Sequence, residues 1–484
     1  MSKFYITTAI PYVNAKPHIG HAFEFVQTDA IARYHKILGD ETLLLSGADE
    51  NALKNVHAAE KENISVQELV DKNSLLFQNL AKKLNVNFDI FQRGSDATHH
   101  LSSQKLWELC DKNGDIYKKT YAGLYCIGCE QFYEKKELNE KGECFEHPGK
   151  KLDEISEKNY FFRLSKYQNK LIKLLESNAV DIVPEFRKNE MLSFLKNPLQ
   201  DISISRSNER AKNWGVPVPN DVSQRMYVWF DALNIYQSAV GFGDKERQQE
   251  YQKWWPADLH VIGKGILRFH AIYWPAFLLS AKLKLPKKIF VHEYLTVNGQ
   301  KMSKTIGNVI DPVPLIEKYG ADALRYYFLA KISPFSDGDF SEEKFKETYN
   351  SDLANGLGNL VARVAKLCEI DQIEGIKNYE SDKDNLKDRL EDGGYFEHWN
   401  RLELNLAIEE LWREIKSLDT EISRYEPWSK STRERNGHLK SYAKRLLSLA
   451  WFLKPFLPET AEKIEEQFKG PKITSQKPLL FPRI

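Results

Sequence analysis

The first 45 residues constrain the fold most strongly, because they alternate between strand and helix patterns. Residues 4–12 (FYITTAIPY) are rich in β-branched and aromatic side chains, and Pro11 limits the strand that they predict. Residues 20–38 repeat apolar side chains at helical spacing up to Gly39. Residues 42–45 (TLLL) are typical of a buried parallel strand. This order predicts the opening of an α/β fold, a Rossmann-type doubly wound parallel sheet.

The rest of the chain predicts one interruption of this fold and one appended domain. Residues 121–150 are rich in Gly, Cys, Lys and Glu, whereas strand and helix patterns return at 258–263, 268–284 and 288–292. Beyond residue 340 apolar residues keep helical spacing, which predicts an all-α helical bundle, and the charged stretch 371–394 is expected to be a solvated connection. The predicted segments are 1–115 (first sheet half), 116–225 (insertion), 226–340 (second half) and 341–484 (helical domain).

Composition excludes several classes of protein. The 484 residues carry 69 Lys and Arg against 68 Asp and Glu, so the net charge of +1 is not that of a polycation. Nowhere does the sequence approach the roughly 18 consecutive apolar residues of a membrane-spanning helix. The N-terminus lacks the apolar core of a secretory signal. We therefore expect a cytoplasmic protein that does not enter a membrane.

The cysteines favour a metal over disulfides, because they are odd in number and three of the five are clustered. Cys126, Cys129, Cys144 and His147 form a C-x2-C-x14-C-x2-H pattern, whose two chelating pairs suit one tetrahedral zinc ion. With all four ligands supplied by protein, the site would be closed and structural. The alternative is core cysteines beside a surface histidine. Cys110 and Cys368 lack such neighbours, and we expect them to be buried.

Two distant segments have the composition expected for handling phosphates. His18, Gly20 and His21 lie where the first strand meets the first helix, and a helix N-terminus favours an anion. Gly20 allows a ligand to approach the backbone, although the histidines alone could be caps or surface residues. Lys301 and Lys304 flank a small hydroxyl residue in a loop that could neutralise a leaving pyrophosphate. Taken alone, that loop could equally be a lysine-rich surface loop.

Together, His18-Ile19-Gly20-His21 and Lys301-Met302-Ser303-Lys304 resemble the paired signature of class I aminoacyl-tRNA synthetases, from Phe4 to the helical C-terminus. The strings at 9–14, 201–206, 227–233 and 268–270 are similar to those of methionyl-tRNA synthetases in particular. The resemblance implies activation of L-methionine by ATP, with Mg²⁺, and transfer to tRNA(Met), including the initiator. It also places the family's zinc knuckle in the insertion, and the length leads us to expect a monomer.

The resemblance implies roles for individual residues. Asp49 would hold the methionine ammonium, and an apolar, aromatic pocket suits the polarizable thioether. The pocket positions are Ile10, Tyr12, Trp229, Ala232, Tyr236, Ile266 and His270. The ATP positions are His18, Gly20, His21, Glu24, Gly263, Lys301 and Lys304, of which the two histidines and two lysines would be catalytic. The anticodon positions are Asn359, Arg363 and Trp428.

Ordinary structural roles compete with these assignments. Tyr12, Trp229 and Tyr236 could be core aromatics, Arg363 an ion-pair partner and Trp428 a packing residue. The chain also departs from the family, because Asn51-Ala52 stands where His-Gly is usual and Gly265 where aspartate is usual. The alternatives are a class I paralogue that charges another apolar amino acid, and a catalytically silent tRNA-binding paralogue.

Overall fold

The computed structural model describes residues 2–126, 131–133, 138–144, 149–150, 152–302 and 307–484, with the side chains of 121, 131 and 132 left aside. The chain divides by its contacts into two compact units, which we describe separately. The first unit comprises Met1–Pro17, Asp40–Leu80 and Phe88–Val291, and the second comprises His18–Gly39, Ala81–Asn87 and His292–Ile484. No helix among the described residues is long and apolar enough to cross a membrane.

The first unit is built on a six-stranded sheet with strand order β3-β2-β1-β12-β13-β7. β1 pairs in parallel with β2 and with β12, β2 with β3, and β13 with β7. The predicted parallel α/β sheet is therefore confirmed. The strands are β1 (Lys3–Thr7), β2 (Glu41–Ala48), β3 (Ile90–Arg93), β7 (Asp181–Val183), β12 (Leu259–Gly263) and β13 (Lys288–His292).

Helices of the first unit pack their apolar faces on this sheet, and Phe230, Trp274 and Phe277 lie fully inside the resulting core. The α-helices are α2 (Leu53–Glu62), α3 (Val66–Lys83), α4 (Ala97–Lys112), α5 (Gln168–Glu176), α6 (Glu185–Phe194), α7 (Val228–Ala232), α8 (Ile235–Ser238), α9 (Gln248–Trp254) and α10 (Trp274–Ser280). Shorter turns are η2 (Leu164–Tyr167), η3 (Lys264–Ile266) and the π-helical η4 (Phe269–Tyr273).

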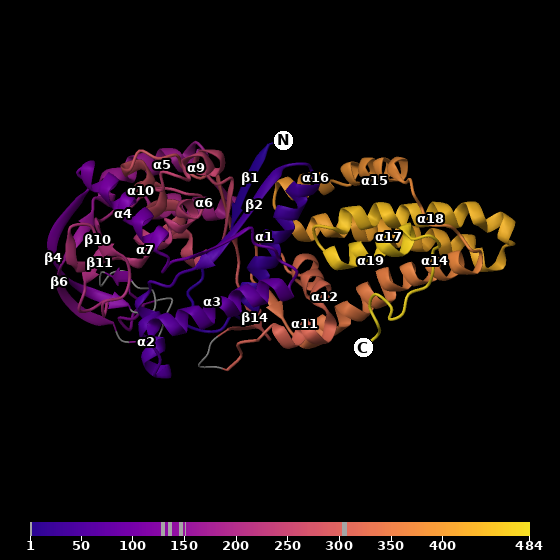
Figure 1. Cartoon of the computed structure of the whole chain (residues 1–484), viewed down its shortest axis with the longest axis horizontal. Coiled ribbons are helices and arrows are strands. Elements are labelled where there is room, and N and C mark those ends of the chain that lie inside the picture. Colours follow the sequence, from indigo (N-terminus) through magenta and orange to yellow (C-terminus); the bar gives the residue numbers. More distant parts are fainter. Residues whose placement is uncertain (1, 127–130, 134–137, 145–148, 151, 303–306) are drawn as a thin grey trace. The chain divides into compact units, whose positions relative to one another are not determined.

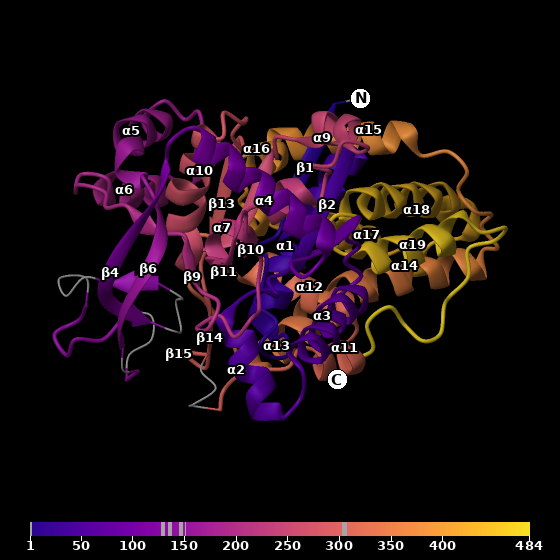
Figure 2. The ribbon, with the colours of Figure 1, turned by 60° about the vertical axis from the view of Figure 1, so that its left-hand side comes forward.

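Two small antiparallel sheets occupy the predicted insertion. β4 and β6 form a long ribbon that extends away from the helices around it (Figure 2). That sheet has the order β5-β4-β6-β8, and the second has the order β10-β11-β9. Their strands are β4 (Ile116–Cys126), β5 (Gln131–Tyr133), β6 (Asp153–Phe162), β8 (Ile202–Ser203), β9 (Ser205–Ser207), β10 (Pro217–Val218) and β11 (Asp221–Met226).

The second unit contains α1 (Ile19–Ile37), a small sheet and a largely helical C-terminal region in which α14, α17, α18 and α19 run side by side (Figure 1). Its strands are β14 (Leu295–Val297), β15 (Gln300–Lys301) and β16 (Gly338–Phe340). The helices are α11 (Val313–Tyr319), α12 (Ala321–Tyr326), α13 (Glu342–Thr348), α14 (Asn359–Ile370), α15 (Glu380–Asp392), α16 (Tyr395–Asn400), α17 (Leu404–Tyr425), α18 (Thr432–Leu453) and α19 (Pro458–Lys469). Two π-helices are η5 (Tyr327–Lys331) and η6 (Tyr349–Gly358), and a short 3-10 turn is η7 (Pro427–Ser429).

Two predictions about elements are wrong. The strand predicted over 4–12 ends at Thr7. One more backbone hydrogen bond follows, from the Thr8 N–H to the Leu45 carbonyl at 3.0 Å, and pairing then returns as a bridge between Tyr12 and Asp49. The stretch 371–394 is not simply a solvated connection, because it contains α15. Leu386 and Leu390, one helical turn apart, are buried there, and this single apolar stripe was masked by the surrounding charges.

Candidate functional site

The carboxyl ends of β1 and β2 form one side of the predicted methionine site, in the first unit. Tyr12 and Asp49 lie opposite each other in a parallel bridge, and the Asp49 N–H donates to the Pro11 carbonyl at 2.9 Å. Asp49 is buried, whereas Ile10 and Tyr12 are partly buried against the core. Ligands of open α/β sheets bind outside these strand ends, so three predicted residues lie where the fold places ligands.

A stack of aromatic rings forms another part of this site. Trp229, on α7, lies face to face with Phe269 at 3.7 Å between ring centroids and 6° between planes. The Tyr12 ring stands edge-on to Trp229 at 6.2 Å, and His270 at 6.4 Å. Our sequence analysis did not include Phe269 as a site residue, although it directly precedes His270. The stack gives the site a polarizable apolar wall.

A polar chain runs beside that wall. His270 Nδ1 lies 2.9 Å from the Ile266 carbonyl oxygen, which only accepts, so this nitrogen carries a proton. Burial lowers the pKa of His270 to about 4, and the ring is therefore neutral near pH 7. Nε2 is then an acceptor, and the Tyr236 hydroxyl, 2.7 Å away, donates to it. The Tyr236 hydroxyl proton is therefore directed towards His270.

His260, which sequence analysis also missed, packs against Tyr236 in this polar chain. Its ring lies 4.3 Å from that of Tyr236, and its Nδ1 is 2.7 Å from the Thr7 hydroxyl. His260 is fully buried on β12, and burial holds its pKa well below the usual value. A histidine inside the apolar run Leu259–Gly263 was the available signal. Gly263 ends the same strand, and Ala232 lies buried at the end of α7.

The predicted histidine pair lies at the N-terminus of α1, in the second unit. His18 is the N-cap, and its Nδ1 accepts from the Gly20 N–H at 3.1 Å. His21 Nδ1 accepts from the His18 N–H, also at 3.1 Å. A backbone N–H only donates, so each neutral ring carries its proton on Nε2. Burial, and then the His18 ring at 3.9 Å, lower the pKa of His21 well below its usual value.

The segment around the second signature contacts the same helix end. A side chain on Gly20 would place its Cβ 3.4 Å from the Met302 methyl carbon, and the Ile19 N–H donates to the Ile310 carbonyl at 3.0 Å. Gly20 and Met302, about 280 residues apart, are therefore neighbours in the second unit. Lys301 is exposed on β15, and Lys304 lies outside the described residues.

Glu24, predicted to contact ATP, lies on α1 about one turn beyond His21. Its Oε2 is 2.9 Å from His292 Nε2, so the carboxylate is paired within the second unit. His292 Nδ1 in turn lies 2.9 Å from the Glu293 carbonyl oxygen. Sequence analysis did not single out His292, which ends the β13 strand. Its contact fixes the Glu24 side chain on the helix.

Two of the four predicted zinc ligands can be placed. Cys126 and Cys144 are buried in one small cluster with Leu152, against which Tyr133 packs. The Cys144 thiol lies 3.4 Å from the Tyr133 hydroxyl oxygen. Cys129 and His147 fall outside the described residues. Cys110 and Cys368 are fully buried as predicted, and burial raises the pKa of each thiol to about 12.

The predicted anticodon residues gather on one end of the helical region. Asn359 is exposed at the start of α14, and Arg363 follows one turn later. The Arg363 guanidinium pairs with Asp419, donates to the Ser423 hydroxyl at 3.2 Å and lies 5.9 Å from the Trp428 ring centroid. Trp428 is 50% exposed, so its ring face is accessible. The competing interpretation of Arg363 as an ion-pair partner therefore holds, beside its position near the Trp428 ring.

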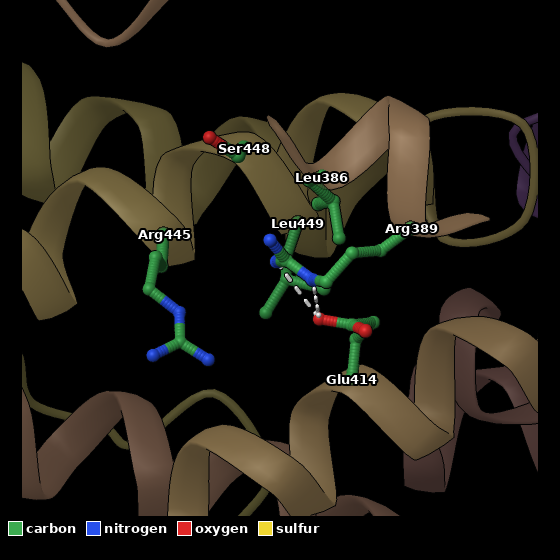
Figure 3. Close-up of a pocket in the computed structure, with 6 residues that line it drawn as sticks. All are labelled: Leu386, Arg389, Glu414, Arg445, Ser448 and Leu449. Carbon is green, nitrogen blue, oxygen red and sulfur yellow. Dashed lines mark hydrogen bonds and ion pairs between the residues drawn. The ribbon is translucent and has the colours of Figure 1, made fainter. Parts of the chain in front are cut away.

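A small pocket elsewhere in this region is lined by Leu386, Arg389, Glu414, Arg445, Ser448 and Leu449 (Figure 3). Inside it the Arg389 guanidinium donates to the Glu414 carboxylate at 2.9–3.0 Å. Arg445 pairs with Glu421. Both guanidinium groups already have carboxylate partners, so this pocket is not an evident anion site.

Comparison with known sequences identifies the class to which these features belong. The sequence model of the family described as tRNA synthetases class I (M) matches residues 4–365, three quarters of the chain. The match includes the parallel sheet, the histidine pair and the second signature. The chain belongs to the class I aminoacyl-tRNA synthetases.

Individual relatives narrow the class further. The methionine–tRNA ligase of Rhizobium meliloti is 42% identical over 96% of this chain and 91% of its own length, and that of Thermotoga maritima is 40% identical over 96% and 74%. The crystal structure of Mycobacterium tuberculosis methionyl-tRNA synthetase bound by methionyl-adenylate matches with a TM-score of 0.90 at 35% identity, covering 99% of this chain and all of that one. Within its class, the chain belongs to the methionine–tRNA ligases.

Proposed function

We propose that the chain joins L-methionine to ATP to form methionyl-adenylate, and then transfers the methionyl group to tRNA(Met). The observation that carries this proposal is the polar chain Ile266–His270–Tyr236 beside the Trp229–Phe269 stack, in a chain of this family. An elongated apolar thioether fits such a wall better than a branched side chain does.

The first unit would bind and orient methionine. The Asp49 carboxylate would hold the α-ammonium, which leaves the substrate carboxylate directed at ATP. A carboxylate oxygen attacks the α-phosphorus, so an oxygen–phosphorus bond to the adenylate forms while the bond between the α-phosphorus and the pyrophosphate oxygen breaks. No covalent bond to the enzyme is needed, so orientation supplies much of the rate enhancement.

The histidine pair of the second unit would stabilise the charge that develops during this step. Each neutral ring carries its proton on Nε2. Such a donor can hydrogen-bond to a phosphate oxygen without adding a second buried positive charge beside the first ring. Lys301 and Lys304 would add positive charge at the leaving pyrophosphate, and Gly20 and Glu24 of the same unit would contact ATP. Mg²⁺ would enter with ATP and neutralise phosphate charge.

The helical region would recognise the anticodon of tRNA(Met). An unstacked base can lie on the exposed Trp428 ring, while the Asn359 amide and the Arg363 guanidinium read its edge. The Asp419 and Ser423 contacts hold Arg363 in one orientation, which suits base reading more than phosphate binding. We propose that the same residues recognise the anticodon of both the initiator and the elongator tRNA(Met).

We also propose one structural zinc ion held by Cys126, Cys129, Cys144 and His147. The support is chemical: the two thiols that the structure describes, those of Cys126 and Cys144, are buried in one small cluster. The ion would stabilise the end of the β4–β6 ribbon. We propose in addition that the protein is a cytoplasmic monomer, and that its chain is organised as the four segments predicted from the sequence.

Exchange of labelled pyrophosphate into ATP, measured with a panel of amino acids, tests the activity. Methionine should support exchange at least 100-fold better than leucine, isoleucine or cysteine. A better rate with any of these would point to a class I enzyme for another apolar amino acid. Absence of exchange with every amino acid, beside intact tRNA binding, would favour the silent paralogue.

A further inference from the structure

Asn51 occupies a buried position between two parts of the methionine site in the first unit. Its side-chain nitrogen donates to the Gly94 carbonyl at 2.8 Å and to the Asp231 carboxylate at 2.5 Å. Only 5% of Asn51 and 2% of Asp231 are exposed. Both amide hydrogens therefore have defined acceptors, and the orientation of the carboxamide is fixed.

Asp231 depends on this contact. His99 Nε2 lies 3.6 Å from this carboxylate, and His100 interacts with it electrostatically. The Asp231 Oδ1 has no hydrogen-bond partner among the described residues. A buried carboxylate that loses a donor retains the full cost of its desolvation. The Asn51 amide is thus the closest group that stabilises this carboxylate within the described part of the chain.

The bond joins two substrate-facing segments. Asn51 follows Asp49 by two residues, and Asp231 stands on α7 between Trp229 and Ala232. The bond therefore ties the segment that holds the ammonium-binding carboxylate to the helix that carries the aromatic wall. A shift of about 1 Å between such groups is enough to slow a reaction strongly.

We propose that Asn51 is a positioning residue, which sets Asp49 against Trp229 by holding Asp231. This inference rests on the proposed methionine site and adds a role to a position where the family usually has histidine. A carboxamide suits this position because it supplies two donors and never gains a charge. Asn51 is not expected to touch substrate, and its effect should fall on methionine rather than on ATP.

Asn51→Asp tests the proposal by replacing the donor with a carboxylate of the same shape. Two carboxylates in contact share a proton, so repulsion should grow as the pH rises. Other titratable groups face this pair from α4, namely His99 and His100, and from the same segment Glu50, which is paired with Arg93. The wild-type enzyme contains the same titratable groups. Comparing the KM of the variant with that of wild type at each pH therefore removes their contribution.

Methionine-dependent pyrophosphate exchange should be measured at pH 6.0 and pH 8.5. For Asn51→Asp we expect the KM for methionine to rise more than tenfold at pH 8.5 and less than threefold at pH 6.0, with the KM for ATP unchanged. Adding Asp231→Asn to this variant should restore the KM at pH 8.5 to within threefold of Asp231→Asn alone. Asn159→Asp, a buried Asn on β6 beside Glu157, is the matched control and should change neither value.

Two results would overturn the inference. One is an Asn51→Asp enzyme with wild-type KM for methionine at both pH values. The other is an equal loss at both pH values that Asp231→Asn does not relieve, which would mark a purely structural role. If Asn51→Asp does not fold, Asn51→Ala should raise the KM for methionine at least threefold, and no change would reject the proposal. Wild type without methionine-dependent exchange would instead reject the proposed function.

Discussion

At the scale of single residues, three histidines of the candidate sites are kept neutral by their surroundings. Burial lowers the pKa of His21, His260 and His270, and no carboxylate is among the causes that act on them. In His21 and His270 a backbone contact then decides which ring nitrogen carries the proton. These rings therefore act as oriented neutral donors and acceptors over the physiological pH range.

A neutral buried histidine makes the fold sensitive to acid. His270 has a pKa of about 4 in the folded chain, below the ordinary 6.5. Between these values the unfolded chain binds a proton that the folded chain does not, so stability is complete above pH 6.5 and falls as the pH drops towards 4. For His270 the loss from pH 7 to pH 5 should be about 2 kcal/mol.

The His270→Gln variant tests this assignment by thermal melting at pH 7 and pH 5. The variant should be less stable than wild type at pH 7, because it loses packing, yet its melting temperature should decrease less on acidification. His260 and His21 remain as a common background in both proteins. An equal decrease in wild type and variant would show that His270 does not have the lowered pKa.

Gly20 provides a second prediction at this scale. A Cβ at this position would lie 3.0 Å from Cε1 and 3.1 Å from Nδ1 of His18, so Gly20→Ala should push that ring out of place. We expect adenylate formation to slow about tenfold or more, since one oriented donor is lost, while the KM for methionine stays within twofold. Gly437→Ala on α18, where a Cβ meets nothing within 4 Å, is the control and should leave both constants unchanged. Unaltered adenylate formation in Gly20→Ala would remove His18 from the ATP site.

At the scale of elements, the β4–β6 ribbon carries the predicted zinc knuckle. Metal analysis of purified protein should find one zinc per chain, and Cys144→Ser should reduce this content to near zero. Because a closed zinc site contributes to folding, the variant should also melt at a lower temperature and lose part of its activity indirectly. Cys110→Ser, a change in the buried core of the same unit, should keep the zinc. A zinc-free wild-type protein would contradict the proposed knuckle.

The turn η7 and the helix α14 carry the predicted anticodon contacts. Trp428→Ala should lower kcat/KM for charging of tRNA(Met) by about 10- to 100-fold, which corresponds to the loss of one stacked base. Pyrophosphate exchange needs no tRNA and should be unchanged. Phe186→Ala, another aromatic side chain that is about half exposed, is the control. Equal charging by the Trp428 variant and wild type would exclude the stacking role.

At the scale of the whole molecule, the sequence predicts elements better than it predicts contacts. The strand at 288–292 and the first helix are confirmed nearly to the residue. The strand has a continuous apolar run, Ile289 to Val291, and the helix is followed by Gly39. The helix α15 was missed because its apolar stripe consists of only two buried residues, Leu386 and Leu390, among many charged ones. The spacing of apolar residues predicts a helix only where the helix buries enough of them to form a recognisable pattern.

The candidate site shows the same limit. The local strings around Trp229 and His270 suffice to place both residues in one pocket, and the structure brings them together. Phe269, His260 and Asn51 were missed as site residues, since their roles depend on stacking and hydrogen bonds between segments far apart in the chain. Such contacts leave no periodic pattern in a single sequence.

The most direct test of the whole account is a single-turnover measurement of adenylate formation. Purified enzyme mixed with ATP and L-methionine should form about one methionyl-adenylate per chain, and added tRNA(Met) should convert it into methionyl-tRNA. His21→Asn should bind methionine normally but form the adenylate about 100-fold more slowly, because a donor to the reacting phosphates is lost. Wild-type enzyme that forms no adenylate from methionine, or a His21→Asn variant as fast as wild type, would contradict the account.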